Sequence, residues 1–406
     1  LAEEGIDSQL LGDDPERQSL YARLESGRET PALILTHHID VVPARSENWS
    51  VEPFSAPVRE GYVWGRGAID AKSLGIAHLI SFIDLARSVG EGAALSRDVI
   101  LLAVADEETG GLAGTASLLE KHPELFEDVG YVLNEGGGNQ VVVDETIFWG
   151  IEIDQKIPLW IELESTGAGG HGAGIHDDSA VIRLLRALDS VRGIKPARSV
   201  TPSVRSYFEA VSKVKKGHKA TVLAEIDQYV ASPQLDSVLP AGYLGLLQDT
   251  WTISVLEAGR RVNVVPEQAR AQIDVRLRPG TDSAQLLEEF RNMVSPHADV
   301  TVLLEGEPAP PSPVDTDLWQ SIEKVLTPIT PSGVIGPMVA LGTTDSRFYR
   351  QRGIVAYGFS PYKINFYDVS TVHGADERIR LNFLLEGIDV MKQIARDFCL
   401  EPQGAE

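Results

Sequence analysis

The apolar residues in the first third of the chain fall into short runs separated by a helical pattern. Runs at residues 32–35, 98–105 and 131–133 are typical of strands buried in a sheet. Between the first two runs, residues 73–89 carry apolar side chains at helical spacing, at Leu74, Ala77, Ile80 and Ile83. This order of strand, helix and strand predicts an α/β sheet that is at least partly parallel.

The pattern changes near residue 155. Residues 157–164 alternate apolar and polar side chains, which indicates a strand with one face in water. The stretch that follows predicts helices at residues 179–191 and 283–293, strands at 252–258, 269–277 and 299–304, and a mostly helical segment at 204–248. Together these elements predict a small α+β unit with an antiparallel sheet.

The proline-rich segment at residues 308–313 is the clearest linker in the chain. After it the α/β pattern returns, with a strand expected at 354–358 and a C-terminal helix at 381–398. We therefore predict a discontinuous catalytic domain, formed by residues 1–154 and 307–406, which is interrupted by an inserted domain of residues 155–306.

Composition excludes several classes of partner. The chain has 406 residues, of which 43% are apolar, and this is enough for two domains. Its net charge of −23 argues against nucleic acid or an anionic membrane as a partner. The one cysteine, Cys399, cannot form an internal disulfide, and no apolar run is long enough to span a bilayer. A cytoplasmic location is expected, although the chain opens at Leu1 without a methionine.

Side chains that bind metals stand at or near the ends of the predicted strands. His38, Glu108 and Glu135 each follow such a run, Asp70 precedes the first predicted helix, and His373 lies near the C-terminus. In α/β sheets, ligands collect at the carboxyl ends of the strands. Two histidines and three carboxylates are the donors expected of a paired divalent-metal site.

Each motif also has an alternative explanation. On a strand, Asp40 would point the same way as His38 and accept its second ring N–H, but a histidine at a strand end is often only structural. Asp70 either bridges two cations or caps the helix that follows it. Glu107 and Glu108 either divide the roles of general base and ligand or are exposed acids in a loop.

The glycine-rich turn around His171 lies in the middle of the chain, within the predicted inserted domain. A histidine in such a loop either stabilises an oxyanion or is an ordinary surface residue. No Walker loop and no Gly-x-Ser-x-Gly element is present, so the sequence gives no support to a nucleotide-binding protein or a serine hydrolase.

The joint order of the motifs resembles the co-catalytic zinc amidohydrolases and exopeptidases, the family that includes aminoacylase, carboxypeptidase S, glutamate carboxypeptidase and acetylornithine deacetylase. The motifs are His38-Ile39-Asp40, Gly65-Arg66-Gly67 with Asp70, Asp106-Glu107-Glu108-Thr109-Gly110, Asn134-Glu135-Gly136-Gly137, Gly170-His171-Gly172 and His373-Gly374. The helical insert and the segment Gly342-Thr343-Thr344-Asp345-Ser346-Arg347 are most similar to the branch of carboxypeptidase S and the N-acyl-amino-acid amidohydrolases.

The resemblance implies a mixed, largely parallel sheet with helices on both faces and an inserted α+β lid and dimerisation domain. It also implies two zinc ions, although manganese or cobalt would bind the same donors. One zinc would be held by His38, Asp70 and Glu135, and the other by Asp70, Glu108 and His373. Glu107 would be the general base, and Asp40 would support His38.

The family pattern further places substrate contacts at Asn263 and Arg276, with Arg276 facing the substrate carboxylate, and at Gly342 and Thr343. In this family the loop histidine arrives from the partner subunit, so the resemblance implies a homodimer in which His171 acts across the inserted domains.

The expected reaction is hydrolysis of an amide bond next to a free carboxylate, above all the deacylation of N-acyl amino acids. The alternative within the family is a dipeptidase or carboxypeptidase on short peptides. A third hypothesis is a metal-stabilised binding or scaffold protein without catalysis. The intact Glu107 argues against this third hypothesis, because a structural site has no use for a base beside its ligands.

Overall fold

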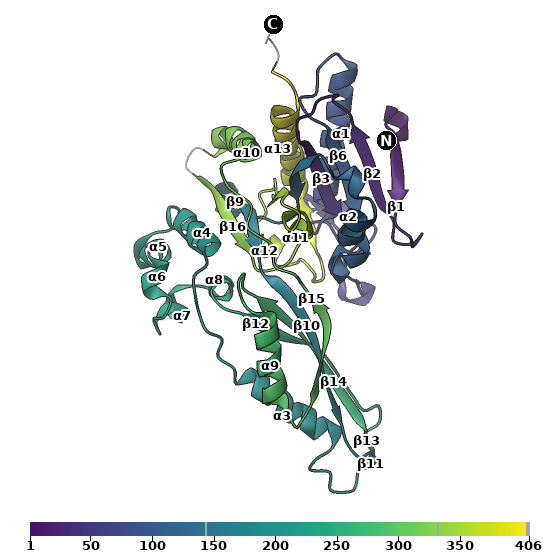
Figure 1. Cartoon of the computed structure of the whole chain (residues 1–406), viewed down its shortest axis with the longest axis vertical. Helices are drawn as coiled ribbons and strands as arrows, with labels where there is room; N and C mark the ends of the chain where they lie inside the picture. Colours follow the sequence, from purple (N-terminus) through teal and green to yellow (C-terminus); the bar gives the residue numbers. More distant parts are fainter. Residues whose placement is uncertain (143, 331–332, 403–406) are drawn as a thin grey trace.

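The computed structural model describes residues 1–142, 144–330 and 333–402, and Figure 1 shows the chain with its labelled elements. A large mixed sheet has the strand order β1-β2-β6-β3-β7-β17-β9-β16, with β8 paired to β9. Its strands are β1 (Ser8–Leu11), β2 (Ser19–Leu24), β3 (Ala32–His38), β6 (Val99–Val104), β7 (Val129–Asn134), β8 (Gln140–Val142), β9 (Glu145–Gln155), β16 (Val334–Ala340) and β17 (Val355–Gly358).

The centre of this sheet is parallel. Strands β6, β3, β7 and β17 run in the same direction, and β9 and β16 form a second parallel pair. Antiparallel pairing occurs between β1 and β2, β2 and β6, β8 and β9, and β17 and β9. The mixed α/β fold expected from the sequence is therefore confirmed.

Both faces of the central strands are buried. In β3, Leu33 and Leu35 pack into the core beneath α1 (Lys72–Gly90) and α13 (Leu381–Cys399). Ile34 points the other way, into the core beneath α2 (Ser117–Lys121) and α11 (Ser346–Arg350). A strand covered on both faces needs a continuous apolar run, which is why the sequence predicted these strands without alternation.

The helices of the described residues are of moderate length. The helices α1 and α13 have 19 residues each and pack side by side, with α10 (Asp317–Leu326) against α13. Among the described residues, no helix combines the length and the hydrophobicity needed to cross a lipid bilayer. The cytoplasmic location stays a prediction.

A second, antiparallel sheet has the order β12-β14-β10-β15. It consists of β10 (Ile157–Thr166), β12 (Thr250–Ala258), β14 (Gln268–Leu277) and β15 (Asp299–Glu305). One face packs on α3 (Ala180–Arg192) and α9 (Ser283–Val294) through residues such as Leu159, Ile161 and Leu163. The alternation in β10 therefore marks a sheet with one covered face, as the sequence predicted.

The helical segment between the two halves of this sheet packs elsewhere. It contains α4 (Pro202–Ser212), α5 (Gly217–Ala224), α6 (Ile226–Tyr229), α7 (Leu235–Val238) and α8 (Ala241–Leu246). Val204 and Phe208 of α4 share a core with Phe148 of β9 and Val339 of β16, so these helices cover an edge of the large sheet. The division of the chain at residues 154/155 and 306/307 stays a prediction.

Two strands at this edge of the large sheet, β9 and β16, were absent from the sequence prediction. In β9, the acidic residues Glu152 and Asp154 occupy buried positions, so the run does not read as an apolar strand. Glu152 is buried because the guanidinium of Arg350 pairs with it at 2.8 Å. A third sheet, made of β18 (Arg378–Arg380), β5 (Tyr62–Trp64) and β4 (Val58–Arg59), was also absent from the prediction, because its strands have only two or three residues each.

Two histidines are buried between β3 and α1. His37 and His78 have exposed fractions of 7% and 0%, and their ring centroids are 5.6 Å apart. Burial, together with the charge of His38, lowers the pKa of His37 to about 4. Burial, together with His37, holds the pKa of His78 well below its ordinary range. Both rings are therefore neutral at pH 7.

Because His78 is buried as a neutral ring, we expect the free energy of unfolding to decrease in acid. Unfolding returns its pKa to about 6.5, so below that pH the unfolded chain binds an additional proton and the free energy of unfolding falls. We expect His78→Leu to reduce this pH slope by up to about 1.4 kcal/mol per pH unit between pH 6.5 and 5. Urea unfolding at several pH values measures the slope. His122→Leu, at a partly exposed surface site, is the control. Equal slopes in His78→Leu and the wild type would contradict this account.

Candidate metal centre

The predicted metal ligands lie at the carboxyl ends of three neighbouring strands. His38 is the last residue of β3, Glu108 lies in the turn after β6, and Glu135 follows β7. These strands are adjacent in the order β6-β3-β7. Asp70 precedes α1, and His373 lies between α12 (Phe366–Val369) and β18. Residues far apart in the sequence therefore meet at one edge of the sheet.

The carboxylate of Asp70 lies between the two histidines. Its Oδ1 is 3.0 Å from Nε2 of His38, and its Oδ2 is 3.1 Å from Nε2 of His373. Nε2 of His38 is also 3.3 Å from Oε2 of Glu135, and Nε2 of His373 is 3.2 Å from Oε2 of Glu108. The five side chains thus form two groups that share Asp70.

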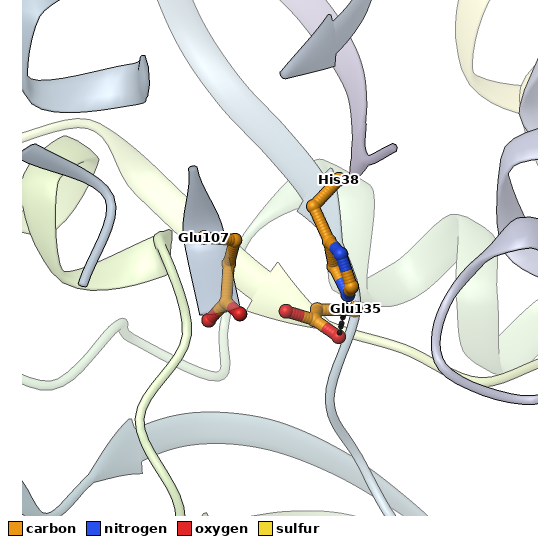
Figure 2. Close-up of side chains that lie close together, drawn as sticks. All are labelled: His38, Glu107 and Glu135. Carbon is orange, nitrogen blue, oxygen red and sulfur yellow. Dashed lines mark ion pairs between the residues drawn. The ribbon is translucent and has the colours of Figure 1, made fainter. Parts of the chain in front are cut away.

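Glu107 lies at the edge of this cluster. One donor atom from each of His38, Glu107 and Glu135 lies within 4.8 Å of the other two. Figure 2 shows these three side chains converging, with the ion pair between His38 and Glu135 dashed. The same mutual separation holds for His38, Asp70 and Glu108.

These distances fit divalent metal ions. In a tetrahedral zinc site with bonds of about 2.0–2.1 Å, neighbouring ligand atoms are about 3.3 Å apart. The four separations between histidine nitrogen and carboxylate oxygen span 3.0–3.3 Å. Imidazole and carboxylate are also the donor types that such ions take. The residues present therefore suit a metal centre.

The electrostatics of the cluster call for positive charge. Burial, followed by the charges of Glu135 and Asp345, raises the pKa of Glu107 well above its usual range. Burial also raises the pKa of Glu135 to about 7, against the opposing charge of His38. Hydrogen bonds to Asp70 and Glu108 raise the pKa of His373 to about 10. Crowded carboxylates must either take up protons or be compensated by cations, and divalent metals supply such cations.

Asp70 shows the opposite behaviour because it touches both imidazoles. Burial by itself raises its pKa, but hydrogen bonds from His373 and His38 outweigh burial and bring the pKa below its usual range. The alternative in which Asp70 caps the helix is wrong. The residue before α1 is Ala71, and no side chain caps this end of the helix.

Asp40 holds the site together in a different way from the one predicted. Nδ1 of His38 is 2.8 Å from the main-chain carbonyl oxygen of Asp40 and 3.7 Å from its carboxylate. The carboxylate instead accepts hydrogen bonds from the backbone N–H groups of Glu107, at 3.2 Å, and Glu108, at 3.0 Å. Because β3 ends at His38, the two-residue repeat of a strand no longer applies to Asp40.

The two glutamates lie in a turn rather than on a strand. Residues Glu107–Thr109 form a short 3-10 helix, which follows Asp106 at a φ of 76°. The carboxylate of Asp106 pairs with Arg17 at 2.5 Å and accepts the N–H of Ala113 at 2.9 Å. The first acid of the run is therefore neutralised within the chain, while the next two face the cluster.

Glu377 was missed in the sequence. This residue is fully buried, and its carboxylate accepts from Nη1 of Arg66 at 2.6 Å. It also accepts the backbone N–H groups of Gly67, Ile69 and Asp70. It thereby fixes the loop that presents Asp70. The available signal was Arg66 itself, because an arginine between two glycines beside the site needs a buried partner.

A cleft of about 380 Å³ opens at the cluster. Its lining includes Glu107 and His373 together with Arg276 of β14. Gly342 and Thr343 line the same cleft, and Nη1 of Arg276 donates to Oγ1 of Thr343 at 2.6 Å. Three of the four predicted substrate residues are therefore brought to the cluster.

His171 and Asn263 lie elsewhere. They meet at the small β11 (Gly170–His171) and β13 (Val264–Val265) ladder, where the N–H of Gly172 donates to the carbonyl of Asn263 at 2.9 Å. Figure 1 places this ladder at the far tip of the four-stranded sheet, away from β3 and β6. The two residues are exposed and adjacent, but the chain does not bring them to its own cluster.

A family model described as "Peptidase family M20/M25/M40" matches residues 34–397. The chain belongs to this family. The resemblance noted in the sequence, including the branch, is therefore confirmed, and the M20 chain is a metal-dependent hydrolase of amide bonds.

Individual relatives agree with this membership. The M20 chain is 26% identical over 363 residues to N-fatty-acyl-amino acid synthase/hydrolase PM20D1 of Xenopus tropicalis, covering 86% of the chain and 69% of that protein. It is 28% identical over 367 residues to aminoacylase-1 of Mus musculus, covering 89% and 78%. The structure of human carnosine dipeptidase 1 superposes with a TM-score of 0.71 at 15% identity, covering 98% and 88%, and shows the shared fold.

The hydrogen bonds of Glu377 generate a prediction on stability. Glu377→Ala leaves Arg66 buried without its partner, and we expect a loss of about 3–5 kcal/mol in the free energy of unfolding. The matched control is Glu386→Ala, which removes the ion pair between the exposed Glu386 and the partly exposed Lys363 at 2.9 Å and should cost less than about 1 kcal/mol. Chemical denaturation at pH 7 measures both, and equal losses would show that Glu377 does not anchor this loop.

Proposed function

We propose that this enzyme removes the acyl group from N-acyl amino acids, cleaving the amide bond next to a free carboxylate. The observation that carries the proposal is the position of Arg276 in the same cleft as Glu107 and the ligand cluster. A cation at that point selects a substrate with an anionic group close to the bond that is cut.

Arg276 keeps part of its hydrogen-bonding capacity for a substrate. Its Nε and Nη2 donate to the two carboxylate oxygens of Asp274 at 2.7 and 3.1 Å, and its Nη1 donates to Thr343. A guanidinium has five N–H groups, so these three bonds leave two, one on each terminal nitrogen. That pair suits a carboxylate, while Asp274 and Thr343 hold the guanidinium in place.

We propose that two divalent cations occupy the cluster, with zinc the first choice and manganese or cobalt able to bind the same donors. One would be held by His38, Asp70 and Glu135. The other would be held by Asp70, Glu108 and His373. When bound, the cations supply Lewis acidity, which lowers the pKa of water and polarises the scissile carbonyl.

Glu107 is the residue we assign to proton transfer. Its carboxylate takes a proton from the attacking water as the new carbon–oxygen bond forms. It then gives the proton to the nitrogen as the carbon–nitrogen bond breaks, so that the amine leaves neutral. The carboxylate of Asp40 accepts a hydrogen bond from the backbone N–H of Glu107 and so positions this residue, which supports the assignment.

The alternative, a dipeptidase or carboxypeptidase, would receive a substrate with a free α-amino group on the acyl side. The cavity on that side of the cluster is lined by Lys215 and Lys219, and apart from Asp70 and Glu135 no described lining residue is a carboxylate. A free ammonium group would find no carboxylate among these lining residues other than those two predicted metal ligands, so the lining favours an acyl group without a free ammonium.

The proposal is tested with N-acetyl amino acids, the matching dipeptides and N-acetyl amino acid carboxamides. We expect the zinc-loaded wild type to hydrolyse the N-acetyl amino acids and to disfavour the other two classes. Glu107→Gln should retain two metal ions per chain and lose about 10²–10⁴-fold in kcat. Glu108→Gln is the matched control, because loss of a ligand should lower the metal content. Preference for dipeptides, or metal loss in Glu107→Gln, would overturn the corresponding assignment.

We also propose that the enzyme is a homodimer that pairs through the four-stranded sheet. Strand β12 lies at the edge of that sheet and exposes Ile253, Val255 and Leu256, with exposed fractions of 36%, 36% and 59%. An unpaired edge with apolar side chains favours association with another chain. A partner would also bring His171 and Asn263 to a cluster that they do not reach in their own chain.

Mixed dimers test this arrangement. Chains carrying Glu107→Gln and His171→Ala are co-expressed with different tags, and the heterodimer is isolated. If His171 acts across the interface, the heterodimer has one intact site and about half of the wild-type activity. Each parent homodimer should be at least about 100-fold impaired. A heterodimer no more active than the mean of its parents would place His171 in its own chain or outside the mechanism.

A further inference from the structure

A second and larger cavity begins at the metal cluster and extends away from the cleft. Its volume is about 870 Å³, towards the upper end of the range for sites that hold drug-sized ligands. We call it the acyl chamber, and it is lined by the Gly136–Gly138 loop, α8, the segment around α12 and the α1 terminus. Helix α8 belongs to the helical segment that covers the edge of the large sheet.

The cleft and the acyl chamber meet only at the cluster. Among the residues that line the two cavities, Asp70 and Glu135 are the ones they share. An amide bond held at that junction therefore has its two ends in different surroundings. The end with the free carboxylate faces Arg276 in the cleft, and the acyl group enters the chamber.

The walls of the chamber are mainly apolar. They include Leu74, Met338, Phe359 and Ile364. Gly137 keeps the loop close to the sheet, since its φ is 72° and a Cβ atom would lie 2.5 Å from the carbonyl oxygen of Gly150. Phe366 lines the chamber and is 81% exposed, so an aromatic ring stands at the mouth. Such walls suit a hydrocarbon chain.

Two lysines interrupt this apolar lining. Lys215 and Lys219 both line the chamber and are partly buried, whereas Lys213 and Lys216 of the same basic run are exposed. The run is therefore split between solvent and the chamber.

The two ammonium groups have no anionic partner among the residues that the structure describes. Nζ of Lys215 donates to the side-chain carbonyl of Gln140, and Nζ of Lys219 lies 5.5 Å from the centre of the Tyr243 ring. Burial and the neighbouring charge of Lys219 lower the pKa of Lys215. Two like charges at an apolar wall are costly without an anion, which points to a ligand that brings one.

The sheet fixes how far the lysines lie from the cluster. Gln140 pairs with Phe148 of β9, and β9 is two strands away from β7, which carries Glu135 at its end. Through Gly358, the end of β7 is level with Glu152 of β9, four residues along the strand from Phe148. Two strand spacings of about 4.8 Å and four residues of about 3.3 Å give a separation of about 16 Å. An extended chain advances about 1.2 Å per bond, as in a polypeptide, and covers this distance in about 13 bonds.

We propose that the acyl chamber binds acyl chains that end in a carboxylate, so that the preferred substrates are amino acids acylated with a medium-chain dicarboxylic acid. The distal carboxylate would pair with Lys215 and Lys219, and the chain would lie along the apolar walls. This proposal rests on the proposed deacylase function and adds the class of acyl group to it.

The test compares matched substrates. One is an amino acid carrying an N-dodecanoyl group, and its partner carries the 11-carboxyundecanoyl group of the same length. We expect the zinc-loaded wild type to prefer the carboxylated substrate by about 10- to 100-fold in kcat/KM. A second pair, N-butanoyl against N-(3-carboxypropanoyl), is too short to reach the lysines and should show no such preference. A ratio near one for the long pair, or an equal preference in the short pair, would overturn the proposal.

Variants assign the preference to the lysines. Lys215→Met and Lys219→Met keep the apolar stem and remove the charge, and each should lower the ratio for the long pair by about tenfold. Lys216→Met, at the exposed neighbour, should leave the ratio unchanged. Because both substrates are measured on the same preparation, partial loss of folding does not alter the ratio. An unchanged ratio in both chamber variants would refute the role of the lysines.

Calorimetry separates this proposal from the deacylase function. Dodecanedioic acid and dodecanoic acid are titrated into the zinc-loaded enzyme, and tighter binding of the diacid by about tenfold is expected. If no N-acyl amino acid is hydrolysed but the diacid binds more tightly, the deacylase function fails and the chamber assignment stands. If N-acetyl amino acids are hydrolysed and the two acids bind equally, the chamber assignment alone fails.

Discussion

Repulsion among closely placed carboxylates is the constraint on which this site depends. Asp70, Glu107, Glu108 and Glu135 are gathered within a few ångströms at one edge of a sheet. Such a group keeps its negative charge only if positive charge lies among the oxygens, and the two histidines are the nitrogen donors placed between them. This arrangement is unfavourable without cations, but with them it gives strong metal binding and a fixed geometry. The positions of the acids in the fold therefore create the requirement for metal.

Backbone hydrogen bonds hold these acids against their repulsion. The carboxylate of Asp40 binds the N–H groups of the two glutamates in the turn after β6, and Glu377 does the same for the loop that carries Asp70. Neither residue has to touch a metal for this. Each carboxylate accepts hydrogen bonds from N–H groups in a loop that has no partner in a sheet. Asp40 is itself in contact with His38, and Glu377 with Arg66. Rigid loops at the ends of rigid strands explain how a small number of side chains can define the site.

The sequence predicted what repeats along the chain and what carries a strong chemical signature. The buried strands β3, β6 and β7 appear as apolar runs, and His38 and Glu135 stand directly at their ends. By contrast, β9 escaped because its buried Glu152 is compensated by Arg350, which lies almost 200 residues away in the sequence. The roles of Asp40 and Glu377 escaped for the same reason, since their partners are backbone N–H groups that only the folded loops bring near. The local sequence pattern reveals buried strands and metal ligands. A buried charge whose partner is distant in the sequence is recognised only in the three-dimensional structure.

Each of the two cavities contains positively charged side chains, although the protein as a whole is negatively charged. The protein as a whole carries a net charge of −23, so an anionic substrate meets a repulsive field at long range. Within the molecule, however, the cleft offers Arg276, and the far wall of the acyl chamber offers Lys215 and Lys219. These cations line two different cavities, which share only Asp70 and Glu135 of the cluster among their lining residues. A substrate with a carboxylate at each end would place both charges on these groups and its amide bond at the junction. Selection would then come from short-range pairing inside the cavities, because the overall field opposes any anion that lacks such a fit.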